Sequence, residues 1–244
     1  MTSGSDSLYK LLPKIKRARD YHLYDFGGRR YLDLWADGGR ALMGHRKGRS
    51  VLDMKSCLEK GLGGSYPSVY PRRLLKQLGR LYPSVEAVSV VFAGGGAGGY
   101  PVYRPFSAAA PPEGVFELLV PMPGSSALRV LCAGSADSLP ASDPVPAFLL
   151  AGLCRAAADL ASFDAAEAEK NWASFDCGLW RREGPWLYSN IGGAEYDQLF
   201  KRLKNRGIVI SPYADSPSCA PSLFTAGEIK PIRELADGGP DDGS

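Results

Sequence analysis

Apolar and polar residues alternate from Tyr21 to Leu34, on either side of the adjacent glycines Gly27 and Gly28. Alternation with a period of two is typical of half-buried strands, and paired glycines favour a tight turn with positive φ. The pattern therefore predicts a β-hairpin over 21–34. A glycine-rich approach follows it, from Asp37 to the pair Gly44-His45.

Longer segments carry apolar residues at helical spacing. Helices are expected over 8–19 with an interruption at Pro13, and over 50–62, 71–81, 147–162, 194–205 and a last segment capped by Thr225 with Glu228. Asp164 is expected to cap a further short helix. Strands are expected over 85–92, 115–120, 128–132, 175–180, 186–191 and 208–210.

The helix over 50–62 receives two detailed expectations. Ser50 with Asp53 is expected to form a capping box. Its apolar stripe is expected to face the core and consists of Val51, Leu52, Cys57, Leu58 and Leu62.

Composition limits the class of protein. A chain of 244 residues, 45% apolar and 23% charged, is long enough to bury a substantial core. The longest apolar run, 148–154, stops at Arg155 and is too short to cross a bilayer. The first residues have no apolar core of a signal peptide, and the five cysteines are scattered. Reduced thiols and a cytoplasmic location are therefore expected, without a structural zinc site.

The net charge of +3 is unevenly placed. Residues 1–50 hold eleven Lys and Arg against five Asp, with a basic run over 14–19. Such a run can form a surface for an anionic partner, whether nucleic acid or phosphate. A solvated face beside the hairpin is the preferred interpretation, because no nucleic-acid-binding motif accompanies the run.

The same hairpin carries a family resemblance. The pattern Tyr-Asp-x-x-Gly-x-Arg-Tyr-Leu-Asp-Leu starts at Tyr24, and Leu-Met-Gly-His follows at 42–45. Further similar stretches occupy 58–62, 72–88, 203–212 and 221–229. In this order, the motifs resemble those of the class III pyridoxal-phosphate (PLP) aminotransferases, most closely glutamate-1-semialdehyde aminomutase. Roughly the first ninety and the last sixty residues are covered.

The resemblance implies an α/β fold of the PLP-transferase kind (fold type I). A small α+β domain would comprise 1–65 and 165–244, drawn from both chain ends. A much reduced remnant of the large PLP-binding domain would comprise 66–164. Since that remnant is short, the resemblance implies a truncated, degenerate relative.

Catalysis in the resembled family requires a lysine for the Schiff base and an acid beside the pyridine nitrogen. No lysine occurs between Lys76 and Lys170, and Lys170 stands in a polar helical stretch. The strand most similar to the one that carries the family's acid ends in Ala133-Gly134, and Asp137 follows only later. The sequence therefore predicts no catalytic residue.

A glycine run at 94–99 replaces the family's phosphate-binding turn. Gly94, Gly95 and Gly96 can present N–H groups to an anion, so we identify them as a vestigial phosphate loop. The run also matches GxGxxG, but Glu117 lies inside the next expected strand and not at its end, which disfavours a dinucleotide site.

Other catalytic sets are weakly indicated. His22 and His45 are the only histidines, so a histidine-rich metal site is excluded. His45 is expected to act structurally in its turn. No GxSxG motif occurs, and a Cys–His nucleophilic pair stays open.

The expectation is an aminotransferase-like protein without catalysis or cofactor, in a binding, regulatory or partner-subunit role. The alternative is a PLP-dependent enzyme of the aminomutase type that uses an unrecognised lysine. The expected partner is a second copy or a full-length relative, contacted through the loop 93–110 with Tyr103 and Phe106. Neither a membrane nor a nucleic acid is expected as a partner.

Overall fold

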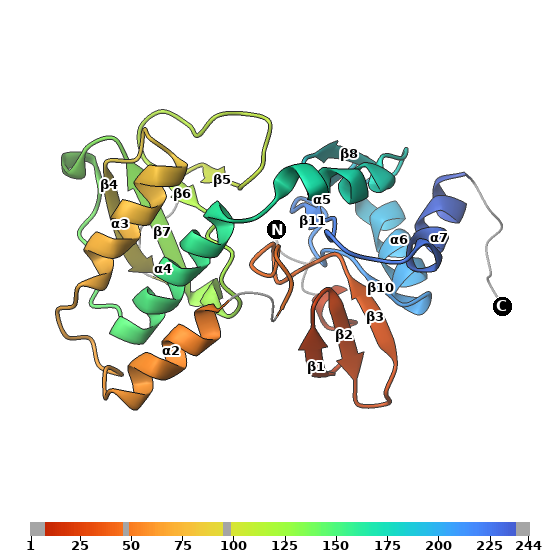
Figure 1. The fold of residues 1–244 in the computed structure, drawn as a ribbon. Coiled ribbons are helices and arrows are strands. Elements are labelled where there is room, and N and C mark those ends of the chain that lie inside the picture. The colour runs from red at the N-terminus through yellow and green to blue at the C-terminus, as the bar shows by residue number, and fades with distance from the viewer. Residues whose placement is uncertain (1–7, 46–48, 95–98, 238–244) are drawn as a thin grey trace. The chain divides into compact units, whose positions relative to one another are not determined.

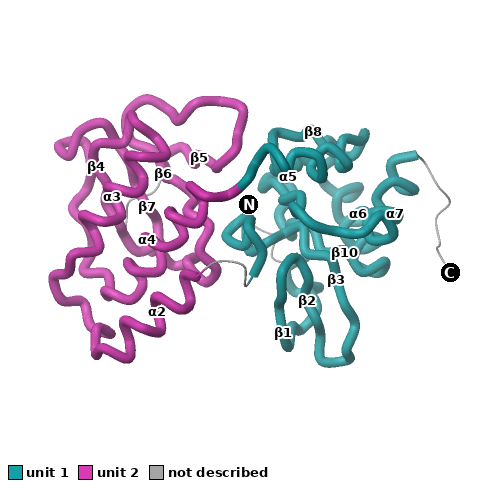
Figure 2. The backbone as a smooth tube through the Cα atoms, viewed as in Figure 1, with its two compact units in different colours: residues 1–46, 164–244 teal, residues 47–163 magenta. Residues whose placement is uncertain are grey.

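The structure is a computed structural model that describes residues 8–45, 49–94 and 99–237. The chain divides into two compact units (Figure 2). Unit 1 combines both chain ends, residues 1–46 and 164–244, and unit 2 is the continuous stretch 47–163.

The described part of unit 1 is built on two small sheets and the helices α5, α6 and α7 (Figure 1). The four-stranded sheet has the order β1-β2-β3-β10, with β1 Ile15–Arg19, β2 His22–Asp25, β3 Arg30–Asp33 and β10 Ile208–Val209. The second sheet has the order β11-β9-β8, with β8 Trp180–Glu183, β9 Trp186–Ser189 and β11 Ser218–Cys219. The helices are α5 Ala165–Trp172, α6 Gly193–Asn205 and α7 Ala226–Ala236.

The predicted hairpin is confirmed as β2 and β3, which pair antiparallel. Strand β10 then pairs with β3 in parallel, Ile208 opposite Leu32. The hairpin and the segment 194–210 therefore share one unit, as the sequence predicts. The inward residues expected for α6 are also confirmed, because Tyr196, Phe200 and Leu203 are buried.

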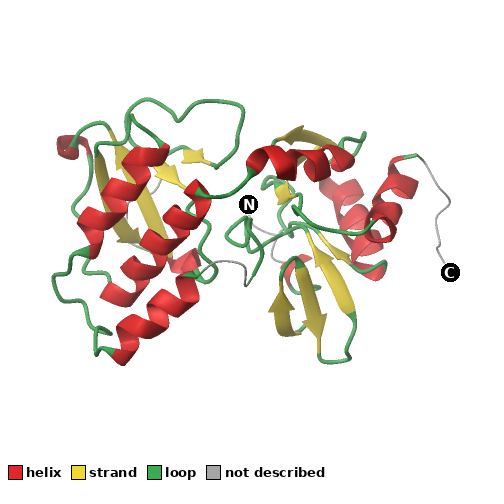
Figure 3. Cartoon of the chain, viewed as in Figure 1, coloured by secondary structure: helices red, strands yellow, loops and turns green. Residues whose placement is uncertain are grey.

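Unit 2 packs three helices on a four-stranded sheet (Figure 3). The sheet order is β4-β7-β6-β5, with β4 Ala87–Phe92, β7 Leu128–Ala133, β6 Phe116–Leu118 and β5 Val102–Tyr103. Strand β7 runs antiparallel to both neighbours, and β5 runs parallel to β6. The helices are α2 Ser50–Glu59, α3 Tyr70–Leu81 and α4 Ala147–Ala161.

The core of unit 2 lies between the sheet and the helices α3 and α4. Leu74 and Leu78 of α3 and Leu153 of α4 are almost fully buried against Val90 and Val130 of the sheet. The buried positions recur with a period of 3.6 in the helices and of two in the strands. The pattern of apolar residues therefore predicted these elements correctly.

Two expected elements differ in the structure. The segment 15–19 forms the strand β1 and no helix, because it pairs with β2 beyond Pro13. The strand expected over 175–180 begins only at Trp180, after a short 3-10 turn over Ala173–Phe175.

Helix α2 differs from both of its detailed expectations. Ser50 is the first helical residue, and no side chain caps the helix, so the capping box is wrong. Arg49 N–H instead donates to Asp159 Oδ2 at 3.0 Å. The expected core stripe is also wrong except at Cys57, since Val51 and Leu58 are exposed.

The first unit boundary lies at 46, earlier than the expected 65. Helix α2 packs on α4 at Gly152, where an added Cβ would meet Met54 Cγ at 2.8 Å. This close approach of the two helices makes α2 part of unit 2.

Candidate functional site

The segment 21–45 folds around the buried carboxylate of Asp33, at the end of β3. Asp33 Oδ1 accepts hydrogen bonds from the backbone N–H groups of Trp35 and Ala36, both at 3.0 Å. Its Oδ2 lies 2.7 Å from Nε2 of His45, and the two side chains are 2% and 16% exposed. Asp33 therefore uses both oxygens to fix the loop that follows β3.

That loop contains four consecutive residues with positive φ. The φ angles are 50° at Ala36, 52° at Asp37, 65° at Gly38 and 89° at Gly39. Gly39 N–H donates to the carbonyl of Trp35 at 3.2 Å, which closes one left-handed helical turn. This conformation costs roughly 1–2 kcal/mol for each residue with a side chain. Strain of this kind clusters at functional segments, so the turn 36–39 is our candidate functional element.

His45 is held from its backbone as well. His45 N–H donates to the carbonyl of Asp20 at 2.7 Å. Gly44 before it has φ 88°, and an added Cβ would lie 3.1 Å from the same carbonyl oxygen. Only glycine fits this approach, which explains the Gly-His pair seen in the sequence.

Residues from the C-terminal part of unit 1 hydrogen-bond to the segment 21–45. Leu34 N–H donates to Val209 at 2.7 Å, and Cys219 N–H donates to Leu34 at 2.6 Å. The hydroxyl of Tyr21 hydrogen-bonds to that of Ser222. Burial raises the pKa of Tyr21 to about 12, so this hydroxyl stays protonated near neutral pH.

An ionic cluster ties α7 to the hairpin. Glu228 Oε1 lies 2.7 Å from His22 Nε2 and 3.0 Å from Arg30. Its Oε2 accepts from the backbone of Thr225 at 2.8 Å, which confirms the predicted capping box. Burial alone would raise the pKa of Glu228, but the hydrogen bonds from Thr225 and His22 outweigh it and hold the pKa below its ordinary value.

The geometry around His45 positions a loop and contains no complete nucleophilic set. A histidine oriented by a carboxylate is one half of such a set, and a hydroxyl or thiol is the other. Among the described residues, neither histidine has a hydrogen-bonded cysteine or serine. Burial also raises the pKa of the Cys132 and Cys154 thiols to about 12, which keeps both protonated.

The predicted phosphate loop is only partly described. Gly94 is an exposed turn residue after β4, and an added Cβ would meet nothing within 4 Å. Gly95 and Gly96 lie outside the described residues. Shortly after the run, the short strand β5 pairs with β6, within the segment 93–110 that the sequence predicted as a loop.

The lysines of the described chain lie at the surface. All are exposed except Lys204 of α6, which is half-buried. Lys170 forms an ion pair with Glu167 one helical turn away, and Lys55 pairs with Glu59 at 3.6 Å. Lys47 lies outside the described residues.

In the described part of unit 2, no acidic residue stands at the end of β7, the strand that the sequence analysis compared with the acid-bearing strand of the resembled family. Strand β7 ends in the buried Ala133, and Asp137 is exposed in the following 3-10 turn. Glu117 of β6 forms an ion pair with Arg129 at 3.4 Å. In the described chain, no group of three or more His, Cys, Asp or Glu is arranged to hold a metal ion. No helix there is long and apolar enough to span a membrane.

Asp33 is the residue of this candidate site that sequence reasoning missed. It stood inside the quoted family pattern, but its burial comes from pairing with β10, far along the chain. The available signal was an acid at the end of a strand, twelve residues before His45.

Comparisons with known proteins give relatives of two kinds. An uncharacterised protein of Treponema pallidum is 27% identical, and the match covers 86% of this chain and 89% of that one. Glutamate-1-semialdehyde 2,1-aminomutase of Clostridium acetobutylicum is 29% identical over 82 residues, which cover 34% of this chain and 19% of the enzyme. No model of a known protein family matches the sequence.

Solved structures resemble the whole chain. An ornithine aminotransferase from Plasmodium yoelii has a TM-score of 0.62 at 13% identity, covering 92% of both chains. An acetylornithine aminotransferase from Elizabethkingia anophelis has a TM-score of 0.64 at 12% identity, covering 97% of this chain. At such identities the likeness is one of fold.

Proposed function

This chain has the fold of the class III PLP-dependent aminotransferases, and we propose that it is a member of that fold that acts by binding and not by transamination. In this proposal unit 1 corresponds to the small domain and unit 2 to a reduced large domain. The role is regulatory or that of a partner subunit. A cytoplasmic location belongs to the proposal, in keeping with five free cysteines.

The surface position of the described lysines carries the proposal. A Schiff-base lysine needs a held amine whose pKa is lowered by its surroundings. The described lysines are instead exposed, apart from the half-buried Lys204, and Lys55 and Lys170 form ion pairs with glutamates on their own helices. The residues at the end of β7 likewise supply no acid for a pyridine nitrogen. The described residues therefore do not fit PLP as a covalently held cofactor.

A borohydride trapping experiment tests the proposal. The protein is mixed with one equivalent of PLP, reduced, digested and analysed by mass spectrometry. Because exposed lysines react weakly with any aldehyde, the same mixture in urea is the control. We expect scattered, substoichiometric labels that are no stronger in the folded protein than in urea.

Stoichiometric labelling of one lysine in the folded protein alone would favour the rival function, a PLP-dependent enzyme of the aminomutase type. Lys47 is then the first residue to replace, and Lys47→Arg should abolish the label. A visible absorbance band that survives dialysis would support the same rival.

The partner surface predicted from the sequence, the loop 93–110, stays a prediction. Tyr103 packs its ring on Tyr82 and Phe116, with centroids 5.5 and 6.0 Å apart. Phe106 packs on Phe163 at 5.4 Å. Both rings are half-buried and packed within unit 2, so each offers only part of its surface to a partner.

A different apolar face supports a partner role. Val51, Leu52 and Leu58 of α2 are 57%, 63% and 50% exposed. Tyr66 and Val69, in the connection to α3, are exposed as well. Apolar groups gathered in this way usually mark an interface. We propose that a second copy of the chain covers this face.

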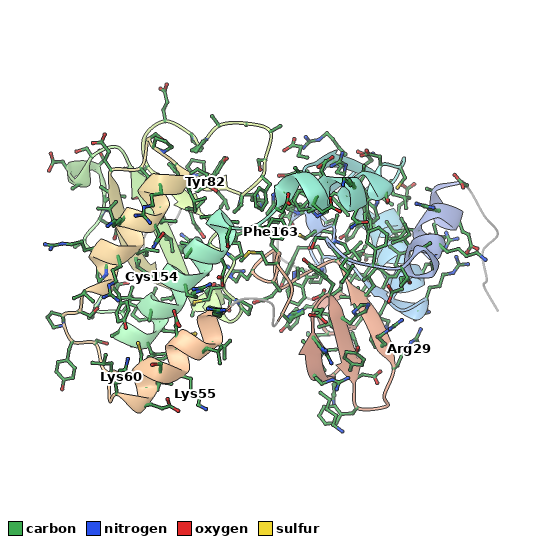
Figure 4. The ribbon with its side chains drawn as sticks, viewed as in Figure 1. Arg29, Lys55, Lys60, Tyr82, Cys154 and Phe163 are labelled. Carbon is green, nitrogen blue, oxygen red and sulfur yellow. The ribbon has the colours of Figure 1, made fainter. Side chains whose placement is uncertain are left out.

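Charge complementarity favours a second copy. Lys55 lies on the same side of α2 as Val51 and Leu58, and Glu59 lies beside it one turn later. Two such helices packed antiparallel bring Lys55 of each copy near Glu59 of the other. The side chains of Lys55 and Glu59 are 71% and 65% exposed, and Figure 4 shows Lys55 pointing out from α2.

A further inference from the structure

A groove of about 370 Å³ lies in unit 1 beside the β2–β3 turn. Leu11 and Pro13, just before β1, contribute apolar side chains to it. Phe26 of the turn and Tyr31 of β3 add two aromatic rings, and Lys204 comes from the end of α6. The volume is that of a small-molecule site.

Two lysine side chains line this groove, those of Lys14 and Lys204. Neither lysine has an ion-pair partner within the described chain. The groove's one carboxylate, Asp25, is already engaged: Oδ1 accepts from Arg29 N–H at 2.9 Å and Oδ2 from the Tyr31 hydroxyl at 3.0 Å. The groove therefore combines two lysines that have no ion-pair partner in the described chain with one carboxylate whose two oxygens already accept hydrogen bonds.

Neighbouring residues add to the positive field. The guanidinium of Arg29 lies 5.1 Å from the centre of the ring of Tyr31, which lines the groove, and Figure 4 shows Arg29 beside the hairpin. Strand β1 begins at the groove and exposes Lys16, Arg17 and Arg19. This is the basic run that the sequence singled out and that the proposed function does not use.

Phe26 indicates what kind of anion the groove suits. It is 72% exposed at the tip of the hairpin, so its ring makes little contact with its own chain. A planar heteroaromatic base can stack on such a ring, a contact that tolerates any base. A bare phosphate would leave Phe26 and the apolar side of the groove without a role.

We propose that the groove binds a nucleotide, with the base on Phe26 and the phosphate between Lys14 and Lys204. The nucleotide is either free or part of a single strand, and the recognising chemistry is the same for both. The site does not depend on whether the chain has lost PLP chemistry.

The test is calorimetric titration of the full chain with AMP, with an oligodeoxyadenylate and with inorganic phosphate. Phe26→Ala should weaken AMP binding at least fivefold, and Phe26→Trp should restore it, because stacking is retained. Lys204→Glu should also weaken binding about fivefold or more. Lys201→Glu is the matched control: it makes the same charge change on the same helix, outside the groove, and should change the affinity less than twofold.

The salt dependence separates the two sources of nucleotide. If a single strand is the ligand, the oligomer binds more tightly than AMP, and two phosphate contacts give a log–log salt slope of about −1.4. If a free nucleotide is the ligand, AMP binds as tightly as the oligomer.

Three results would overturn the proposal. One is the absence of AMP and oligomer binding at millimolar concentration. Another is equal weakening by Lys201→Glu and Lys204→Glu, which would mean general attraction to a basic surface. The third is phosphate binding as tight as that of AMP and unchanged in Phe26→Ala. Thermal unfolding of each variant checks that the exposed substitutions leave the fold intact.

Discussion

At the scale of single residues, the roles of glycine and histidine could be predicted more readily than that of Asp33. The pair Gly44-His45 stood out because glycine at positive φ leaves a signature in the sequence. Asp33 is decided by its surroundings, since its carboxylate is buried only when β10 pairs with β3. The pattern of neighbouring residues in the sequence does not reveal a contact with a strand so far along the chain.

Replacement of Asp33 should be severe. Asp33→Ala removes the acceptor of two buried backbone N–H groups and the partner of His45, so we expect a loss of about 3–5 kcal/mol in the free energy of unfolding. Urea unfolding measures it. Asp137→Ala, an exposed position, is the control and should stay within about 0.5 kcal/mol of the wild type.

Glu228 should make stability depend on acid. Its pKa is lowered in the folded chain, so its contribution is present above the ordinary value of 4.5 and is lost as the pH falls through the lowered value. We expect the wild type to lose stability between about pH 5 and pH 3 relative to Glu228→Gln, measured by urea midpoints. Parallel pH profiles for the two proteins would contradict this role.

At the scale of elements, periodicity located the helices but did not orient α2. Apolar residues cover a wide arc of this helix, from Cys57 and Met54, which pack inward, to Val51 and Leu58, which are exposed. The packing partner α4 selects the side of Met54 and Cys57, because Gly152 opens room there. The β1 strand was missed for a related reason: its pairing with β2, and not its own composition, decides its conformation.

Gly152→Ala should not give the increase in stability that a glycine-to-alanine substitution in a helix usually gives. Gly→Ala inside a helix ordinarily gains roughly 1 kcal/mol. At 152 the new Cβ would meet Met122 Sδ at 2.6 Å and Met54 Cγ at 2.8 Å, so we expect Gly152→Ala to lose about 1 kcal/mol or more. Gly227→Ala in α7 has open space and should be neutral or stabilising. Thermal unfolding of both variants makes the comparison.

Pairing through α2 should follow charge rules. We expect light scattering to find a dimer of the wild type at micromolar concentration. Lys55→Glu should weaken it by placing like charges together, and Lys55→Glu with Glu59→Lys should restore it. A monomeric wild type, or a double exchange no better than the single one, would reject antiparallel pairing. Leu52→Asp should give monomers as well.

At the scale of the whole molecule, the fold was accessible through the resemblance and not through the pattern alone. The motifs at both chain ends implied one shared domain, and β3 with β10 realises that arrangement. The position of the first unit boundary was not accessible, because it follows from the packing of α2 on α4. The phosphate loop predicted in the glycine run 94–99 stays a prediction, since residues 95–98 fall outside the described chain.

Unit 2 should fold on its own, whereas the N-terminal part of unit 1 should depend on the C-terminal part of the chain. Unit 2 is one continuous stretch with its own core, so a fragment of residues 47–163 should fold and unfold cooperatively in urea. A fragment that ends at residue 206 lacks β10, β11 and α7, and its hairpin should lose protection from hydrogen exchange. Equal protection of the hairpin in that fragment and in the full chain would contradict the dependence on β10.

The pairing of β3 with β10 also sets an order of events during synthesis. All of unit 2 is synthesised before β10, the strand that pairs with β3 of the hairpin. The hairpin therefore stays without this neighbouring strand until residues 208–209 have been translated. At about 5–20 residues per second, that wait is on the order of ten seconds or more. During this time, the backbone N–H and C=O groups of β3 that later bond to β10 are unpaired. The nascent chain should therefore be most dependent on chaperones after unit 2 has folded and before residue 209 emerges.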